Sequence, residues 1–140
     1  MLDRFIEAQS KYYRTALEEV ETGKKKSHWM WFIFPQIKGL GYSKISQYFA
    51  IQSRGEAEAY LAHPVLGKRL IRISEALLDL ETNDPGEVFG EIDAMKLQAS
   101  MTLFFCVSRE DVFADVLVKY FNGLAHWETV LTLRDLAKEE

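Results

Sequence analysis

The chain has 140 residues, of which 48% are hydrophobic and 27% charged, with one cysteine and a formal net charge of −4. This composition excludes an intrinsically disordered chain, the single Cys106 excludes an internal disulfide, and the longest apolar run, residues 29–34, is too short to span a bilayer. We therefore expect one globular, cytoplasmic domain over residues 1–140, without a secretory leader or a membrane partner. The acidic net charge also makes a general nucleic-acid binder unlikely.

Residues 2–22 are predicted to form an amphipathic helix, because apolar side chains recur at the i, i+3, i+4, i+7 spacing and Gly23 follows. Pro35 and two glycines interrupt the next, aromatic segment. Residues 29–37 are therefore expected to form a short helix or an irregular stretch that leads into a loop.

Three further helix starts are predicted from caps in the middle of the chain. Ser43 can cap a short helix, and residues 53–61 begin with a serine that has a glutamate three positions later, which is the capping-box pattern. His63 and Pro64 indicate the next start, because proline is tolerated in a first helical turn. Leucines and an isoleucine at helical spacing extend that helix to about Leu80.

The second half continues in the same way. Residues 83–90 combine a turn with a cap and a short helical turn that Gly90 closes. Residues 93–107 are predicted to be a buried helix, with a strand over 102–107 as the alternative. Ser108 with Asp111 indicates a capping box for a helix that ends at Asn122–Gly123, and residues 127–136 form the last helix. The fold class is therefore all-α, with about six to eight helices and no extended sheet.

The charge is divided unevenly along the chain. Residues 1–70 carry a net +4 and residues 71–140 a net −8, and no carboxylate side chain occurs between Glu21 and Glu56. Seven of the 18 aromatic residues fall in that gap, together with six cations. This segment could carry function. The alternative is that its cations only follow a helix end and its aromatic residues belong to the core.

The spacing of the histidines and of Cys106 gives little support to metal binding or to nucleophilic catalysis. The three histidines are isolated from one another, and Cys106 has no cysteine or histidine near it. Cys106 also lies within an apolar run, which is typical of a core thiol. No metal or cofactor site is predicted, and Gly39–Leu40–Gly41 is too short to indicate a nucleotide loop.

Residues 25–36 form the first cluster that could carry chemistry. Two tryptophans two positions apart cannot share one face of a helix, so either Trp29 or Trp31 should line a surface or pocket. With Lys26 and Gln36 nearby, this pattern suits a phosphate or a purine ring. His28 is a candidate acid or base, and the alternative is a structural hydrogen-bond donor.

The second cluster lies at the predicted helix start after residue 62. Unpaired N–H groups at Pro64, with His63 and Arg69, could hold an anion. The alternative is a capped helix in which Gly67 permits close packing.

The third cluster joins Asp93, Lys96 and Ser100. Asp93 and Lys96 are three apart and should form an ion pair on a helix, and Ser100 continues the polar stripe. The stripe is either a structural network or one wall of a site, and Asp93 could supply the counter-charge of the basic segment or move protons.

Several strings in this sequence resemble one family of small bacterial and fungal proteins. They are Ser27–Gln36, Gly39–Leu40–Gly41-x-Ser43, Ala59–Tyr60–Leu61-x-His63–Pro64-x-Leu66–Gly67-x-Arg69–Leu70, Phe89–Gly90-x-Ile92–Asp93-x-x-Lys96–Leu97 and Ser100–Phe104. The family is domain-of-unknown-function family 1810, sometimes labelled "calpastatin" automatically. The resemblance covers nearly the whole chain and implies a compact helical fold, but no activity. Calpain inhibitors of that type are largely disordered, so we reject the label.

Two functions remain as hypotheses. The first is the binding or turnover of a phosphate-bearing, nucleotide-like small molecule, derived for example from NAD or ADP-ribose. In it, Lys26, Arg69 and the turn at Pro64 hold phosphate, Trp29 or Trp31 stacks a base, and His28 or Asp93 moves protons. The alternative is a non-catalytic interaction or structural domain whose basic aromatic segment, residues 24–49, docks another protein or a second copy of the chain.

Overall fold

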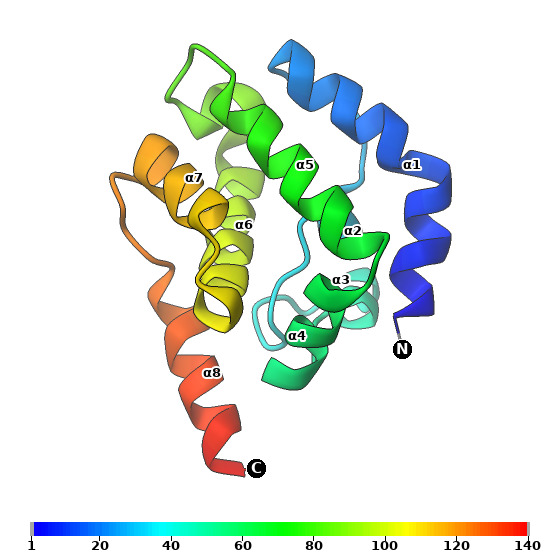
Figure 1. Ribbon diagram of the computed structural model, residues 1–140, viewed down its shortest axis with the longest axis vertical. Coiled ribbons are helices and arrows are strands. Elements are labelled where there is room, and N and C mark those ends of the chain that lie inside the picture. Colours follow the sequence, from blue (N-terminus) through cyan, green and yellow to red (C-terminus); the bar gives the residue numbers. More distant parts are fainter. Residues whose placement is uncertain (1, 140) are drawn as a thin grey trace.

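The computed structural model describes residues 2–139, and this part of the chain contains eight α-helices and no β-strand (Figure 1). The all-α prediction is therefore confirmed. The helices are α1 (Asp3–Thr22), α2 (Met30–Ile33), α3 (Lys44–Phe49), α4 (Arg54–Ala62), α5 (Leu66–Leu78), α6 (Pro85–Ser108), α7 (Asp111–Phe121) and α8 (Trp127–Glu139).

Most helix boundaries follow the predicted caps. The Ser43 and Ser53 hydroxyls accept hydrogen bonds from backbone N–H groups at the starts of α3 and α4. Gly23 ends α1 in the left-handed conformation, and Asn122 ends α7 in the same way. These are local signals, so the sequence alone is enough to read them.

Gly90 interrupts α6 as predicted, with the non-helical angles φ +80° and ψ 161°, and the helical segment beyond it continues to Ser108, so the alternative of a strand over residues 102–107 is wrong. Two boundaries differ from the prediction. Helix α5 ends at Leu78, two residues early. Glu110, rather than Ser108, is the N-cap of α7, because the Ser108 hydroxyl donates to the Phe104 carbonyl and so belongs to the end of α6.

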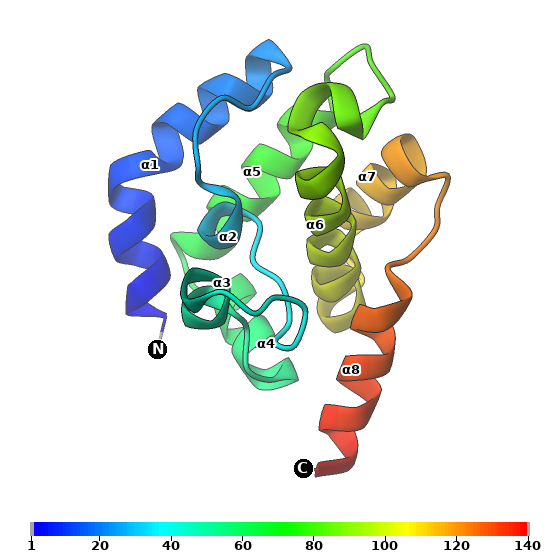
Figure 2. The same cartoon turned by 180° about the vertical axis from the view of Figure 1, so that it is seen from behind.

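The long helix α6 is the centre of the arrangement. It packs against α4, α7 and α8, while α5 packs against α1, α4 and α7. Figure 2 shows α2, α3 and the loop between them on the face that is turned away in Figure 1. The loop is held by a parallel bridge between Ile37 and Ile51. The candidate site described below lies on this face.

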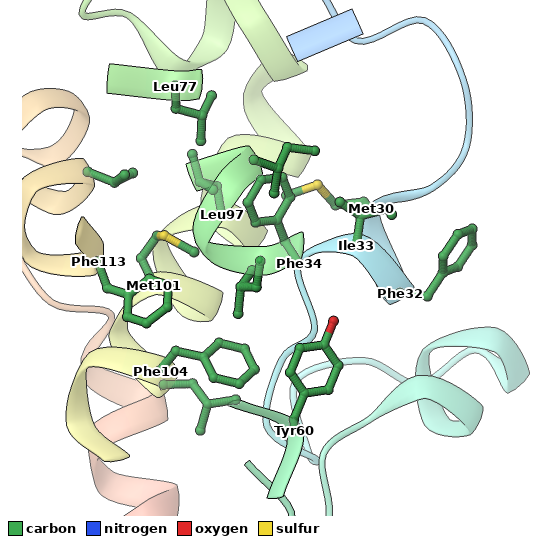
Figure 3. Packing of buried hydrophobic residues seen from close by; sticks show 14 of the residues in the cluster. Met30, Phe32, Ile33, Phe34, Tyr60, Leu77, Leu97, Met101, Phe104 and Phe113 are labelled. Carbon is green, nitrogen blue, oxygen red and sulfur yellow. The ribbon is translucent and has the colours of Figure 1, made fainter. Parts of the chain in front are cut away.

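The core joins the α2 segment to the long helices. Figure 3 shows side chains of α2 and its flank turned toward those of α6, with Tyr60 of α4 beside Phe104. The rings of Tyr60 and Phe104 are 5.3 Å apart, and those of Phe104 and Phe113 are 6.0 Å apart. The aromatics of residues 29–34 therefore largely belong to the core, including Trp29, Phe32 and Phe34.

A half-buried ion pair fixes α1 against α3 and α4. Nη2 of Arg4 lies 2.9 Å from a carboxylate oxygen of Glu56, and the Arg4 guanidinium also donates to the Tyr48 and Ala50 carbonyls. Burial alone would raise the pKa of Glu56, but the hydrogen bonds from Arg4 and from the Gln52 N–H outweigh it and hold this pKa below its usual value.

Candidate functional site

The basic loop after α1 is organised by Glu19. The Glu19 carboxylate accepts hydrogen bonds from the backbone N–H groups of Lys26 and Ser27, from the Ser27 hydroxyl and from Nε1 of Trp29. Trp29 is fully buried, so it has no face open to a ligand in this structure. Sequence reasoning missed Glu19, which stands just before the carboxylate-free segment that drew attention.

Asp93 pairs with two lysines, one on the loop after α1 and one on its own helix, α6. Its carboxylate oxygens lie 3.0 Å from Nζ of Lys25 and 3.1 Å from Nζ of Lys96, so the i, i+3 pair and the counter-charge to the basic segment are both present. The Lys25 ammonium lies 5.1 Å from the centre of the Trp29 ring, and that of Lys96 lies 4.1 Å from the centre of the Trp31 ring. The first cation–π contact lies within the segment before α2, and the second joins α2 to α6.

The pKa of Asp93 reflects this pairing. Burial would raise the pKa, but the hydrogen bonds from Lys25 and Lys96 are the stronger influence and lower it. Asp93 is therefore ionised at neutral pH. In this state it is an acceptor that orients two ammonium groups, which suits a positioning role better than proton donation.

Two of the predicted residues lie away from this cluster on the surface. The side chains of Lys26 and His28 are exposed on the loop between α1 and α2. Neither residue is among those that line the best-formed hollows in the described part of the chain. Their predicted roles in phosphate binding and acid–base chemistry remain predictions.

The helix start at residues 63–69 is a capped start rather than an open anion site. Nδ1 of His63 accepts from the N–H groups of Val65 and Leu66, and the Gly67 N–H donates to the His63 carbonyl. The donors expected to meet a phosphate thus already have partners. Arg69 packs over the Tyr13 ring and lies 3.5 Å from Oε1 of Gln9, on the α1–α5 contact. The four residues Trp29, His63, Arg69 and Asp93 do not line a common hollow.

Two adjoining hollows meet at the α2–α3 loop. The first, of about 300 Å³, lies within the loop and is lined on its polar side by Lys38, Ser46 and three glutamines. The second, of about 250 Å³, lies against α6 and the start of α8. They share Trp31, Gln36 and Leu40 as a common wall, and we call them together the Trp31–Gln36 groove. Trp31 is therefore the tryptophan that lines a pocket.

Gln36 is the unusual member of this wall. Its side chain is only 6% exposed, and its amide Nε2 is buried without a hydrogen-bond partner. Its backbone is fixed, because the Gln36 carbonyl accepts from the Ile51 N–H while the Lys38 N–H donates to the Ile51 carbonyl. A buried amide donor without a partner costs about 1–3 kcal/mol. A rigid backbone therefore holds a side chain that lines both hollows and carries a costly, buried donor.

The loop hollow is shaped by a close approach at Gly41. A Cβ atom on Gly41 would lie 2.6 Å from the Ser46 hydroxyl and 3.3 Å from the Trp31 ring. The segment Gly39–Leu40–Gly41 thus forms a wall, although it is too short to be read as a nucleotide loop. Its contact with Ser46 comes from the tertiary fold, so no sequence signal could have found it.

The hollow against α6 has a mixed lining. Lys96 and His126 face it together with apolar side chains and Glu128. Ser100, one turn beyond Lys96, is fully buried, and its hydroxyl has no partner in the structure. Of the predicted ligand-binding residues, the structure therefore brings Trp31, Gln36 and Lys96 to one groove, while Ser100 lies behind it.

His126 caps α8 and makes the stability of the helix pH-dependent. Its Nδ1 lies 2.8 Å from Oγ1 of Thr129 and accepts from the Thr129 N–H. Burial lowers the pKa of His126, more than Glu128 raises it. The stabilisation is therefore complete above a pH of about 6.5, the unfolded pKa, and decreases as the pH falls below it.

We expect His126→Asn to remove this pH dependence, because asparagine caps a helix without titrating. Urea unfolding between pH 5 and 7.5 measures this. As the pH falls over that range, the free energy of unfolding of the native chain should decrease more than that of the variant, by a difference of less than about 1 kcal/mol. The exposed His28→Asn is the control and should behave like the native chain. Identical slopes for all three would contradict the role of His126.

Neither a metal cluster nor a membrane helix is found among residues 2–139. No group of three or more histidine, cysteine or acidic side chains is placed to hold a metal ion in that range. No helix of the same range is long and apolar enough to cross a membrane.

Comparison with known proteins gives a family and one solved structure. A family model described as "Protein of unknown function (DUF1810)" matches residues 1–133. The crystal structure of the conserved hypothetical protein Rv1873 from Mycobacterium tuberculosis is similar with 40% identity and a TM-score of 0.93. The similarity covers 95% of this chain and 96% of that one. None of the curated proteins compared matches the chain.

Proposed function

The chain belongs to the DUF1810 family of proteins of unknown function, and we propose that it binds a phosphate-bearing, nucleotide-like small molecule in the Trp31–Gln36 groove. The observation that carries this proposal is the buried Nε2 of Gln36, which lacks a partner at the wall of both hollows. A ligand oxygen would satisfy that donor.

The charges around the groove favour an anion. No aspartate or glutamate lines the loop hollow, while Lys38 does, and Lys96 lines the neighbouring hollow. Glu128 is the one carboxylate among the residues that line the two hollows. A phosphate in the groove would therefore have Lys38 in the lining of one hollow and Lys96, which also pairs with Asp93, in the lining of the other, and charge-assisted hydrogen bonds to such cations are strong.

The shape of the groove favours a ligand with two parts. Two hollows of about 300 and 250 Å³ share one wall, and the Trp31 indole contributes to both. A planar base could lie against that ring, since every base offers a π face. Nucleotides and derivatives of NAD or ADP-ribose combine a flat ring with phosphates, so they suit such a pair of hollows.

The variant Gln36→Leu tests the proposal directly. Leucine keeps the approximate volume but removes the amide, so binding of ADP-ribose, NAD or AMP should weaken at least about tenfold. The unfolding temperature of the free protein should stay the same or rise, because the unpaired donor is gone. Calorimetric titration and thermal shift measure the two effects.

The control is Gln98→Leu, whose amide donates to the Leu124 carbonyl away from the groove. This variant should bind the nucleotides as the native chain does. A native chain that no member of the nucleotide panel stabilises, even at millimolar concentration, would overturn the proposal. So would a Gln36→Leu variant with undiminished affinity.

A second candidate function has one observation in its favour. Tyr42, Ile45 and Tyr48 are exposed on and beside α3, with Tyr42 at 90% of its surface. Such a patch suits contact with a second copy of the chain. Light scattering over a range of concentrations tests this function. The native chain should form a dimer that the Tyr48→Lys variant weakens. A native chain that stays monomeric at every concentration would exclude this function.

A further inference from the structure

A third hollow, of about 400 Å³, lies where α4, α6 and α8 approach one another. It shares no lining residue with the Trp31–Gln36 groove. Arg54 enters it from the start of α4, Arg109 from the end of α6, and Arg134 from α8. We call it the arginine hollow.

The arginine hollow is positive within an acidic part of the chain. Residues 71–140 carry a net charge of −8, but no aspartate or glutamate is among the residues that line this hollow. Asp135 contacts Arg134 from outside, at 3.7 Å. Three guanidinium groups from three helices therefore surround one space, and each presents up to five N–H donors.

Two of the guanidinium groups are positioned by contacts that leave donors free. Nη2 of Arg54 donates to the Cys106 carbonyl at 3.1 Å, at the last turn of α6. The Arg109 guanidinium lies 5.3 Å from the centre of the Phe105 ring. Each contact orients a planar group and uses at most one N–H, so both side chains keep donors for an anion.

The backbone at Arg109 is the strongest sign that this side chain is needed. Among the described residues, positive φ angles occur at glycines, at Asn122 and at Arg109, whose φ is +60°. For an arginine this conformation costs about 1–2 kcal/mol, which glycine would avoid. Arg109 also ends α6, where its N–H donates to the Phe105 carbonyl, but glycine or asparagine does this at the other left-handed helix ends of the described residues without the arginine side chain.

The floor of the hollow is apolar. Val107, Val130, Leu133 and Ala137 line it below the arginines, together with the half-buried Cys106. A ligand that fills this space must therefore offer both an anionic end and an apolar body. Inorganic phosphate would satisfy the arginines but leave the apolar floor in contact with water.

We propose that the arginine hollow binds an organic anion, with its carboxylate or phosphate on Arg54, Arg109 and Arg134 and its aliphatic or aromatic body on the Val107–Leu133 floor. This site is separate from the one under Proposed function, and either can fail without the other. Its ligand chemistry is an anionic head on a short apolar body.

Cys106 allows this site to be tested specifically, because it is the single cysteine of the chain and lines the hollow. The probes are octanoate, phenyl phosphate and inorganic phosphate. The rate of alkylation of Cys106 by neutral iodoacetamide is followed by mass spectrometry, and the ratio of rates with and without each probe is compared within one variant. Octanoate or phenyl phosphate should slow alkylation at least about threefold, and inorganic phosphate should slow it much less.

Arg109→Gly is the informative variant. Glycine accepts the left-handed backbone, so the variant should unfold at a higher temperature than the native chain while losing at least tenfold in affinity for the protecting probe. Arg14→Gln removes an exposed arginine of α1 and is the matched control, which should keep full protection. Protection by octanoate alone or by phenyl phosphate alone would support the site and show whether it prefers an aliphatic carboxylate or an aromatic phosphate.

Three results would overturn the proposal. The first is the absence of protection by either organic probe at millimolar concentration. The second is equal protection of the native chain and the Arg109→Gly variant. The third is protection by inorganic phosphate as strong as that by the more protective of the two organic probes, since the apolar floor would then contribute nothing.

Discussion

Replacing Glu19 by alanine is expected to destabilise the protein by about 3 kcal/mol, although Glu19 is only partly buried and lies in no hollow. Four hydrogen bonds end on this carboxylate, and one of them comes from Nε1 of Trp29. Since the Trp29 side chain is fully buried, the variant would leave its N–H without a partner inside the core. Unfolding in urea, followed by circular dichroism, measures the loss.

The pH dependence of this contribution follows from the pKa of Glu19. Burial would raise that pKa, but hydrogen bonds from the Ser27 hydroxyl, the backbone N–H groups and Trp29 lower it from 4.5 to about 2. The folded pKa is thus below the unfolded one. The stabilisation is complete above a pH of about 4.5 and is lost as the pH falls toward about 2.

Two further variants distinguish the effect of the Glu19 carboxylate from a general effect of substitutions in α1. Glu19→Gln keeps one acceptor oxygen, so it should lose about half as much stability as Glu19→Ala and should lose less further stability than the native chain as the pH falls from 4.5 to 2, because only the Glu19 contribution is gone. Glu18→Ala changes the exposed neighbour, which pairs weakly with Arg14 at 4.0 Å, and should shift stability by less than about 0.5 kcal/mol. A loss from Glu18→Ala equal to that from Glu19→Ala would refute the argument.

Glu19 also shows where sequence reasoning stops. The helices could be predicted because periodicity and caps are local, and Ser43 or Ser53 acts within three residues of itself. The partners of the basic loop are not local in that sense. The Lys26 N–H meets Glu19 because the loop folds back onto α1. Asp93 pairs with Lys25, although nearly half of the chain separates the two residues in sequence.

The candidate site is partly predictable for the same reason. Two tryptophans two positions apart must point in different directions, which the sequence shows, but only the fold decides that Trp29 is buried and Trp31 lines the groove. Gln36 could be predicted as a ligand-binding residue only because it lies close in sequence to the two tryptophans and to Lys26. Its unpaired amide and its place in the lining of both hollows depend on tertiary packing, which no spacing encodes.

Gly67→Ala is expected to have the largest effect of all the substitutions considered and to leave little folded protein. A Cβ atom at Gly67 would overlap the carbonyl oxygen of Leu61 and lie 2.9 Å from its carbonyl carbon. Both are backbone atoms, so no side chain can move aside, and α4 and α5 would have to separate. We expect a loss of more than about 4 kcal/mol, measured as soluble yield and as the midpoint of urea unfolding.

The sign of this effect makes it a sharp test. In an exposed helix interior, alanine is more favourable than glycine by about 1 kcal/mol, so propensity alone predicts that Gly67→Ala stabilises α5. Gly55→Ala is the matched control, because Gly55 lies in the first turn of α4 and an added Cβ would meet only the Ser53 hydroxyl, at 3.7 Å. That variant should be as stable as the native chain or slightly more so. If Gly67→Ala behaves like Gly55→Ala, the close crossing of α4 and α5 at Leu61 is wrong, and with it the account of residues 63–69 as a tightly capped turn.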